Sequence, residues 1–274
     1  MAAPKIALVT GSTDGLGRAV ARALATAGFL VLTHGRDTER GSELVREISG
    51  QGGSARFYRA DFASLAEVRA LADSLHREHP RLDVLINNAG IGTSDGKAPP
   101  AQRQTSADGH ELRLAVNYLA GYLLTRLLLP TLVRSAPARI VNVASVGQYP
   151  LDFDNLMLTR AYSGMRAYAQ SKLAQVMFTL DLAEELRASG VTVNCLHPAT
   201  YMDTTMVRGA GIEPTSTVEE GVTAVMRLAV SPELDGCTGG YFDGLRSARA
   251  NAQAYDPQVR QRLAQVSARL TGLG

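Results

Sequence analysis

The sequence predicts an α/β protein built on a single doubly wound parallel sheet with helices on both faces. Three observations lead to this fold class. Short apolar runs alternate with stretches of helical periodicity, the strand candidates are largely apolar along their length, and a glycine-rich turn joins the first strand to the first helix. Strands that are apolar throughout are buried on both faces, and parallel neighbours need crossovers that are usually helices.

Each element follows from its own pattern. The strand candidates are short apolar, β-prone runs, in order residues 6–9, 29–33, 55–59, 82–86, 139–144 and 191–196. The helix candidates place apolar residues three and four apart, in order about residues 18–27, 38–49, 65–78, 107–133 and 164–188. Residues that end helices follow four of them: Gly28, Gly50 with Gly52 and Gly53, Pro80 and Gly190.

Length and composition bound the architecture. The chain has 274 residues, of which 45% are hydrophobic and 20% charged, which suffices for one large core. We expect a single domain over residues 1–274 with a C-terminal amphipathic helical tail over about 256–273. Residues 97–102 and 200–217 are expected to be mobile loops beside the ligand crevice.

Charge and cysteine content exclude several classes of protein. The 28 basic and 26 acidic residues are interspersed, so the basic stripe of a nucleic-acid-binding protein is missing. Cys195 and Cys237 form neither a disulfide framework nor a metal motif, and we expect no metal. Residues 1–5 lead straight into the first strand, and no uninterrupted apolar run reaches the roughly 18 residues of a membrane span. These features predict a cytoplasmic protein without membrane insertion.

A glycine-rich turn over residues 10–17 follows the first strand, with the spacing Gly-x-x-x-Gly-x-Gly. A strand, a glycine turn and a helix N-terminus in this order aim backbone N–H groups and the positive end of a helix dipole at a phosphate. The turn therefore predicts a pyrophosphate cradle for a dinucleotide. The alternative is a tight turn that only lets the helix pack on the sheet.

A second pattern lies in a helix candidate, where Tyr168 and Lys172 are four residues apart and share one face. An ammonium beside a phenol favours the phenolate and makes the tyrosine a usable acid and base. On its own the pair is also typical of a solvated helix face.

Together these residues resemble the short-chain dehydrogenase/reductase family, with its Rossmann-type domain, over nearly the whole chain. The resemblance extends to the retinol-dehydrogenase-like branch, through the 23 positions between Ser145 and Tyr168 and the late stretch 240–244. It implies a catalytic tetrad of Asn117, Ser145, Tyr168 and Lys172. It also implies that the dinucleotide is bound by Gly11, Ser12, Thr13, Gly15, Leu16, Gly17, Arg36, Asp61, Phe62, Asn88, Ala89, Gly90, Tyr168, Lys172, Pro198 and Thr200.

The tetrad residues are expected to divide the chemistry. Ser145 would hold the substrate oxygen, or only cap local backbone. Tyr168 would act as general acid in reduction and general base in oxidation. Lys172 would lower the pKa of that phenol and hold the nicotinamide ribose. Asn117 would reach Lys172 through a water in a proton relay, or bond only to neighbouring backbone.

The end of the second strand governs cofactor choice. By alignment with the family, Gly35 occupies the place of the acid that binds an NAD ribose, and Arg36 follows it, with Arg18 as a possible second cation. NADP(H) is favoured and NAD(H) remains possible, because Arg36 could instead form a surface ion pair and Asp37 could pair with it or cap the next helix.

Two segments depart from the common family pattern. Residues 197–200 read His-Pro-Ala-Thr where the family more often has Pro-Gly, and the threonine expected to meet the carboxamide is Thr204, one position late. The insertion 148–166 is expected to form a surface loop that either contributes to substrate choice or serves as a structural lid.

The predicted function is an NADP(H)-dependent oxidoreductase that interconverts a carbonyl and an alcohol on a small or lipophilic substrate. A non-catalytic dinucleotide-sensing regulator is the alternative. A nucleotide-sugar epimerase is a third reading, but only 78 residues follow Leu196. The resemblance implies a homodimer or homotetramer paired through the helices that hold Asn117 and Tyr168.

Overall fold

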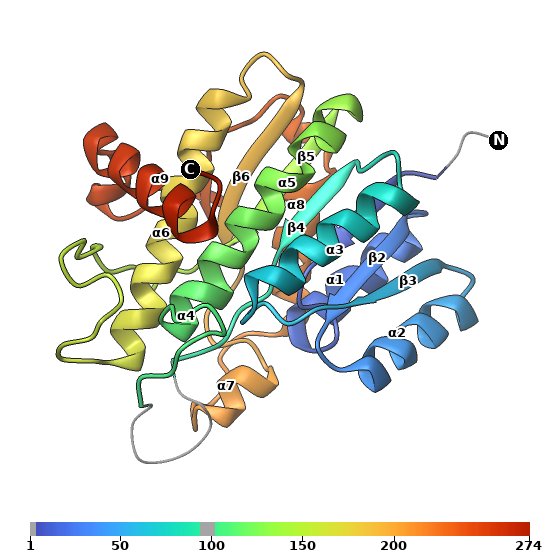
Figure 1. Cartoon of the computed structure of the whole chain (residues 1–274). Helices are drawn as coiled ribbons and strands as arrows, with labels where there is room; N and C mark the ends of the chain where they lie inside the picture. The colour runs from blue at the N-terminus through green and yellow to red at the C-terminus, as the bar shows by residue number, and fades with distance from the viewer. Residues whose placement is uncertain (1–3, 94–101) are drawn as a thin grey trace.

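A computed structural model describes residues 4–93 and 102–274, and its strands form one eight-stranded sheet (Figure 1). The order across the sheet is β3-β2-β1-β4-β5-β6-β7-β8, and every neighbouring pair is parallel except β7 with β8. The strands are β1 (Ile6–Val9), β2 (Leu30–Gly35), β3 (Ser54–Arg59), β4 (Val84–Asn87), β5 (Ala138–Val143), β6 (Val191–His197), β7 (Tyr241–Asp243) and β8 (Arg246–Ala248).

Helices cover both faces of the sheet, as the sequence predicts. One face packs against α1 (Gly15–Thr26), α2 (Thr38–Gly50) and α8 (Val218–Val230). The other packs against α3 (Leu65–Glu78), α5 (Ala120–Arg134) and α6 (Gly164–Glu185). The remaining elements are α4 (Leu112–Leu114), the π-helical turn η1 (Ala115–Leu119), α7 (Thr205–Gly209), η2 (Pro232–Leu234), η3 (Ala252–Tyr255) and α9 (Pro257–Thr271).

Side-chain caps explain where the helices begin. Asp14, Asp37, Ser64, Ser163 and Thr217 precede α1, α2, α3, α6 and α8, and each side chain accepts a hydrogen bond from the first turn. Such caps satisfy backbone N–H groups that have no partner within the helix. Asp37 therefore caps α2, which is one of the two roles that the sequence analysis left open for it.

The structure corrects several predicted elements. The helix expected over 107–133 begins at Leu112 and passes through the π-helical turn before α5. The segment 200–217, expected to be a loop, contains α7, and α8, β7 and β8 follow where no element was predicted. In the insertion, residues 148–163 form a loop with buried leucines, and the last three residues belong to α6. Most of the loop expected at 97–102 lies outside the described residues.

The C-terminal tail is helix α9, which packs against α6 and η1 of its own chain (Figure 1). Arg260 pairs with Asp181 and, at 3.1 Å, with Glu184, while the Tyr118 hydroxyl lies 2.7 Å from that of Ser267. This helix therefore covers part of the surface formed by α6 and η1.

The stretch Leu112–Arg134, which spans α4, η1 and α5, is long and apolar enough to cross a membrane by length and composition. In the structure most of its residues are buried against the sheet and the neighbouring helices. Burial in the core therefore explains the apolar character of this stretch as well as insertion in a membrane would.

The strand order reverses between β1 and β4, because β2 and β3 lie on one side of β1 and β4 to β6 on the other. Ligands of doubly wound sheets bind at the carboxyl ends of the strands at such a switch point. Helices α4 and α7 lie at this edge (Figure 1).

Candidate active site

The glycine turn after β1 has the close contacts of a binding cradle. Gly11 and Gly15 adopt φ values of 64° and 51°, which favour glycine. A Cβ atom on Gly17 would lie 2.2 Å from the Gly11 carbonyl oxygen, and one on Gly11 would lie 2.7 Å from the Cα of Ala89. Only glycine lets these backbones approach so closely.

Two side chains hold the turn against β4. The Asn88 amide donates to the carbonyl oxygens of Thr10 at 2.9 Å and Gly11 at 3.0 Å, while the Thr10 hydroxyl accepts from the N–H groups of Asn88 and Ala89. The side chain of Asn88, which the sequence places among the cofactor-binding residues, thus bonds to the turn itself. It positions the cradle.

Other residues of the turn are also occupied within the protein. The Ser12 side chain is buried and exchanges hydrogen bonds with the backbone of His34. Leu16 is buried in the core, so it offers a ligand only its backbone. Thr13 contacts Gly35, where a Cβ atom would lie 2.5 Å from the threonine methyl. An acidic side chain at position 35 would therefore have to displace Thr13.

A buried histidine, His34, supports the turn, and the sequence analysis assigned it no role. Its Nδ1 accepts the N–H of Gly11 at 3.2 Å, so its Nε2 carries the proton and donates to the Ala60 carbonyl at 3.1 Å. Its ring stacks on Phe62 with a centroid separation of 4.3 Å. Phe62, expected at the cofactor, is itself buried and serves this support.

Several cations lie near the end of β2. Arg18, expected as a possible second cation, lies 2.8 Å from Glu47 in an ion pair with α2. Arg36 and Arg40 are mostly exposed, with side-chain exposures of 67% and 55%. Arg40, in the first turn of α2, was not singled out by the sequence analysis.

Among the described residues, the ion pairs that these two arginines make are exposed or half-buried. Arg36 lies 3.9 Å from Asp61, and Arg40 lies 3.5 Å from Asp14 and 3.6 Å from Asp37. Exposed pairs of this kind contribute about 0–1 kcal/mol, so they yield readily to a better partner.

At the other side of the switch point, Ser145, Tyr168 and Lys172 come together. Ser145 follows β5, and its Oγ accepts the N–H of Gly147 at 3.0 Å, which leaves its own proton free to donate. Lys172 Nζ lies 5.7 Å from the centroid of the Tyr168 ring and donates to the Val143 carbonyl at 2.8 Å and to Gln175 at 2.9 Å.

Burial dominates the electrostatics of this group. It raises the pKa of Tyr168, which a hydrogen bond with Ser145 partly opposes. It lowers the pKa of Lys172 to about 7. The expected lowering of the phenol pKa by Lys172 is thus not found in this structure. A phenol of raised pKa is protonated at neutral pH.

Asn117 lies in the π-helical turn, a rare form that often marks functional sites. Its Oδ1 accepts the N–H of Ile91 at 2.8 Å, and its Nδ2 donates to the Ile91 carbonyl at 3.2 Å and to Ser171 at 3.0 Å. Ser171 in turn donates to the Tyr168 carbonyl at 2.6 Å. The partners of this side chain thus go beyond neighbouring backbone, and the water link to Lys172 stays a prediction.

Gly90 lies between these groups. A Cβ atom here would lie 3.3 Å from Asn117 Oδ1 and 3.7 Å from Lys172 Nζ. The end of β4 thus adjoins both the glycine turn, through Ala89, and the tetrad, through Gly90.

The segment after β6 completes the crevice. Pro198 is buried, and the hydroxyl of the exposed Thr200 lies 3.0 Å from His197 Nε2. Burial lowers the pKa of His197, which Asp243 opposes and Lys172 reinforces. The Thr204 methyl would lie 3.2 Å from a Cβ atom on Gly15, so this threonine reaches the glycine turn.

These residues fit a dinucleotide. The cradle has no room for side chains at Gly11 and Gly17, exposed arginines stand at the end of β2, and buried hydroxyl and ammonium groups lie at the far side of the switch point. This is the layout in which such sheets bind a dinucleotide across the crevice.

Comparison with known proteins agrees with this layout. The model of the short chain dehydrogenase family matches residues 5–214. Retinol dehydrogenase 13 of Mus musculus is 37% identical over 98% of this chain and 84% of its own, and polyprenol dehydrogenase of the same species is 38% identical over 98% and 84%.

A solved structure supports the fold. A short chain dehydrogenase from Shigella flexneri, complexed with NADP, has a TM-score of 0.71 and 26% identity over 88% of this chain and 97% of that chain. With the glycine cradle, the Ser145–Tyr168–Lys172 group and these relatives taken together, the chain belongs to the short-chain dehydrogenase/reductase family, in its retinol-dehydrogenase-like branch.

Proposed function

We propose that the protein is an NADP(H)-dependent oxidoreductase that interconverts a carbonyl and an alcohol on a lipophilic substrate. The observation that carries the proposal is the convergence of Ser145, Tyr168 and Lys172 beside Gly90. When bound, the nicotinamide dinucleotide supplies the hydride for the carbonyl carbon. The protein's own groups handle the oxygen.

Their properties favour carbonyl reduction. Because Ser145 Oγ accepts the N–H of Gly147, its own proton is directed outward, to Tyr168 in this structure and to the substrate oxygen when one is bound. Tyr168, with its raised pKa, is protonated at neutral pH and can give its proton to that oxygen. Lys172, with a pKa near 7, can exist in both protonation states and can help to return a proton to the phenolate.

The preference for NADP(H) rests on the end of β2. No acid stands at Gly35, and Arg36 and Arg40 can release their weak partners to bind a 2′-phosphate by charge-assisted hydrogen bonds. Glycines 11, 15 and 17 would hold the pyrophosphate, and Asp61 would hold the adenine. NAD(H) would lack the 2′-phosphate contacts.

A lipophilic substrate is suggested by apolar side chains around the site. Val146, Tyr149 and Met165 are exposed close in sequence to Ser145 and Tyr168, and Tyr201 and Met206 are exposed in the segment after β6. Exposed apolar side chains that gather at one site commonly mark binding surfaces. The relatives are named for retinol and polyprenol, both apolar alcohols.

Cytoplasmic location and a homodimer or homotetramer remain proposals from the sequence. Because α9 packs on α6 and η1, pairing through these helices would have to use the surface that α9 leaves uncovered.

The test mixes the protein with NADPH or NADH and a series of aldehydes and ketones, and follows the absorbance of the reduced nicotinamide. Tyr168→Phe should lower kcat by at least about 100-fold. The matched control is Tyr58→Phe on β3, which removes a hydroxyl that donates to Glu78 of α3 and should leave kcat unchanged. An unchanged rate in Tyr168→Phe would refute the acid assignment. Tight NADPH binding with no turnover of any carbonyl or alcohol would favour the sensing regulator.

A further inference from the structure

A short segment after β4, residues 91–93, is held by side chains instead of by strand or helix bonds. Asn117 bonds to both the N–H and the carbonyl of Ile91. Arg113 donates through Nε to the Gly92 carbonyl at 2.7 Å and through Nη2 to the Thr93 carbonyl at 3.2 Å. Arg113 and Asn117 are four residues apart, so one helical face supplies all four bonds.

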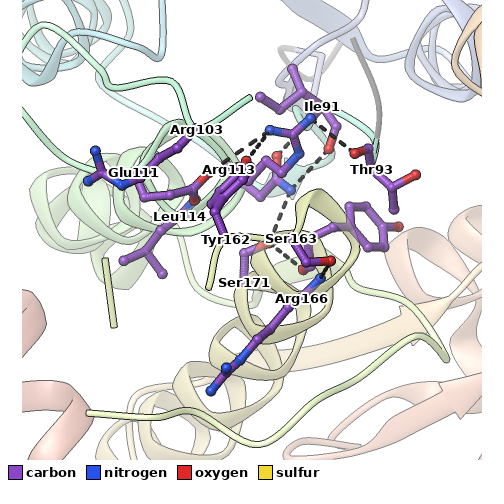
Figure 2. Close-up of polar contacts among 12 residues, drawn as sticks. Ile91, Thr93, Arg103, Glu111, Arg113, Leu114, Tyr162, Ser163, Arg166 and Ser171 are labelled. Carbon is purple, nitrogen blue, oxygen red and sulfur yellow. Dashed lines mark hydrogen bonds and ion pairs between the residues drawn. The ribbon is translucent and has the colours of Figure 1, made fainter. Parts of the chain in front are cut away.

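The remaining edge of the Arg113 guanidinium faces the insertion. Its Nη1 donates to the Tyr162 hydroxyl at 2.8 Å, and that hydroxyl donates to Glu111 Oε1 at 3.2 Å. The other oxygen of Glu111 accepts the N–H of Leu114 at 2.7 Å. Figure 2 shows Arg113 between Thr93 on one side and Glu111 and Tyr162 on the other.

Both charges of this network are buried, with exposures of 2% for Arg113 and 0% for Glu111. Burying an ion pair is costly, and apolar residues of similar volume often stabilise a fold at least as well. A planar guanidinium, however, can satisfy two carbonyls and a hydroxyl in fixed directions. The network is therefore suited to hold the backbone of residues 91–93 in one position.

The segment that it fixes forms a wall of the active site. Its neighbour Gly90 adjoins Asn117 and Lys172. On the side of the segment toward α7, a Cβ atom on Gly92 would lie 2.9 Å from the Cγ of Met206. The segment thus lies between the Arg113 helix and α7, and a shift of its backbone would change the space beside Met206.

We propose that Arg113 is a positioning residue that sets which lipophilic carbonyls the enzyme accepts. It holds residues 91–93, the wall, at a fixed distance from α7, and its third bond, to Tyr162, holds the insertion on the other side of the guanidinium. Substrates of different chain length or bulk are then distinguished by how well they fit against residues 91–93, whose backbone Arg113 keeps rigid. This inference rests on the proposed carbonyl reduction.

The test compares Arg113→Lys with the wild type on NADPH-dependent reduction of butanal and dodecanal. Lysine keeps a charge beside Glu111 but loses the planar fork. The KM for dodecanal should change by about tenfold, the effect of one or two lost charged hydrogen bonds, while kcat and the KM for butanal stay within about twofold. Equal changes for both aldehydes would overturn the proposal, because a general structural role would produce them.

Hydrogen exchange supplies a readout independent of turnover. The Ile91 amide, which donates to Asn117, should exchange at least about tenfold faster in Arg113→Lys, because loss of the bonds to the Gly92 and Thr93 carbonyls frees the segment to open. In Tyr162→Phe the two carbonyl bonds remain, so exchange at 91–93 should be unchanged and exchange at 158–163 faster. Unchanged exchange at 91–93 in Arg113→Lys would also overturn the proposal.

Arg139→Lys is the matched control, because Arg139 likewise donates to two carbonyls, those of Leu228 at 3.0 Å and Ser231 at 2.8 Å. Arg139 lies near the amino end of β5, whereas the candidate active site lies at the carboxyl ends of the strands. Arg139→Lys should therefore leave the ratio of the two KM values unchanged.

If Arg113→Lys does not fold, the double variant Glu111→Gln/Arg113→Met removes both buried charges together. Wild-type selectivity in this double variant would refute the proposal. If the wild type reduces no aldehyde, the proposed function is refuted. Hydrogen exchange at residues 91–93 still tests whether Arg113 holds this segment.

Discussion

His34 couples the glycine turn to pH. Burial lowers its pKa to about 4, against the hydrogen bond to Ala60 and the charge of Asp61. The unfolded chain, with the ordinary value of 6.5, therefore binds more protons than the folded chain between about pH 6.5 and pH 4. The stability that neutral His34 contributes is complete above pH 6.5 and is lost as the pH falls through this window.

The size of the effect follows from this difference in pKa. At about 1.4 kcal/mol per pKa unit, the free energy of unfolding should fall by about 2 kcal/mol between pH 7 and pH 5, and by about 3 kcal/mol at pH 4. The structural reason is local. A protonated Nδ1 would point its N–H at the N–H of Gly11, which now donates to it.

The assay is urea unfolding of the wild type and of His34→Gln at pH 7, 6 and 5. Glutamine does not titrate, and other titrating groups contribute alike to both chains, so the difference between them isolates His34. That difference should fall by about 2 kcal/mol between pH 7 and pH 5. A difference that stays constant within about 0.5 kcal/mol, the usual error of additivity, would refute the reasoning. In the wild type, but not in His34→Gln, the Kd for NADP⁺ should also rise as the pH falls from 7 to 5.

Four further outcomes are expected. Gly17→Ala, whose Cβ would meet the Gly11 carbonyl at 2.2 Å, should raise the Kd for NADPH at least about tenfold by fluorescence titration, whereas Gly50→Ala, with open space around it, should not. Arg40→Ala should raise the Kd for NADPH about tenfold and leave that for NADH unchanged; equal losses would rule out a 2′-phosphate contact. Because burial lowers the pKa of Lys172 from 10.5 to about 7, the stability of the wild type should rise with pH from 7 to 10, and Lys172→Met should remove that slope in urea unfolding while abolishing turnover. Leu123→Ala, at a fully buried position, should lower the free energy of unfolding by about 3 kcal/mol; a loss below about 1 kcal/mol would show that the core refills the cavity.

Much of the fold could be predicted from local pattern. The strand β1 and the helix α3 have the bounds expected from their apolar spacing, and most other predicted elements agree within a few residues. The short strands β7 and β8 were missed because three residues are too few to show a period of two. The π-helical turn also escaped prediction, since its extra residue per turn leaves no distinct sequence pattern.

The candidate site, like the fold, could be predicted only in part. The glycine spacing indicated the cradle and the i,i+4 spacing indicated the pair of Tyr168 and Lys172, because spacing within one element dictates which side chains share a face. Asn117 and Ser145 were added by the resemblance to the family. The partners of Arg18 and the pKa of Tyr168 could not be predicted, since both depend on what tertiary packing places around the group.

The sequence by itself determined the fold class, the order of the elements up to β6 and the glycine cradle, which are properties of neighbours along the chain, and its family resemblance predicted the reacting groups. Only the tertiary structure decided that His34 supports Gly11 and that Arg113 joins Gly92 to Tyr162. Those contacts join segments about 20 to 50 residues apart, and no local spacing encodes them; they form because folding buries polar groups together and each must then find a partner.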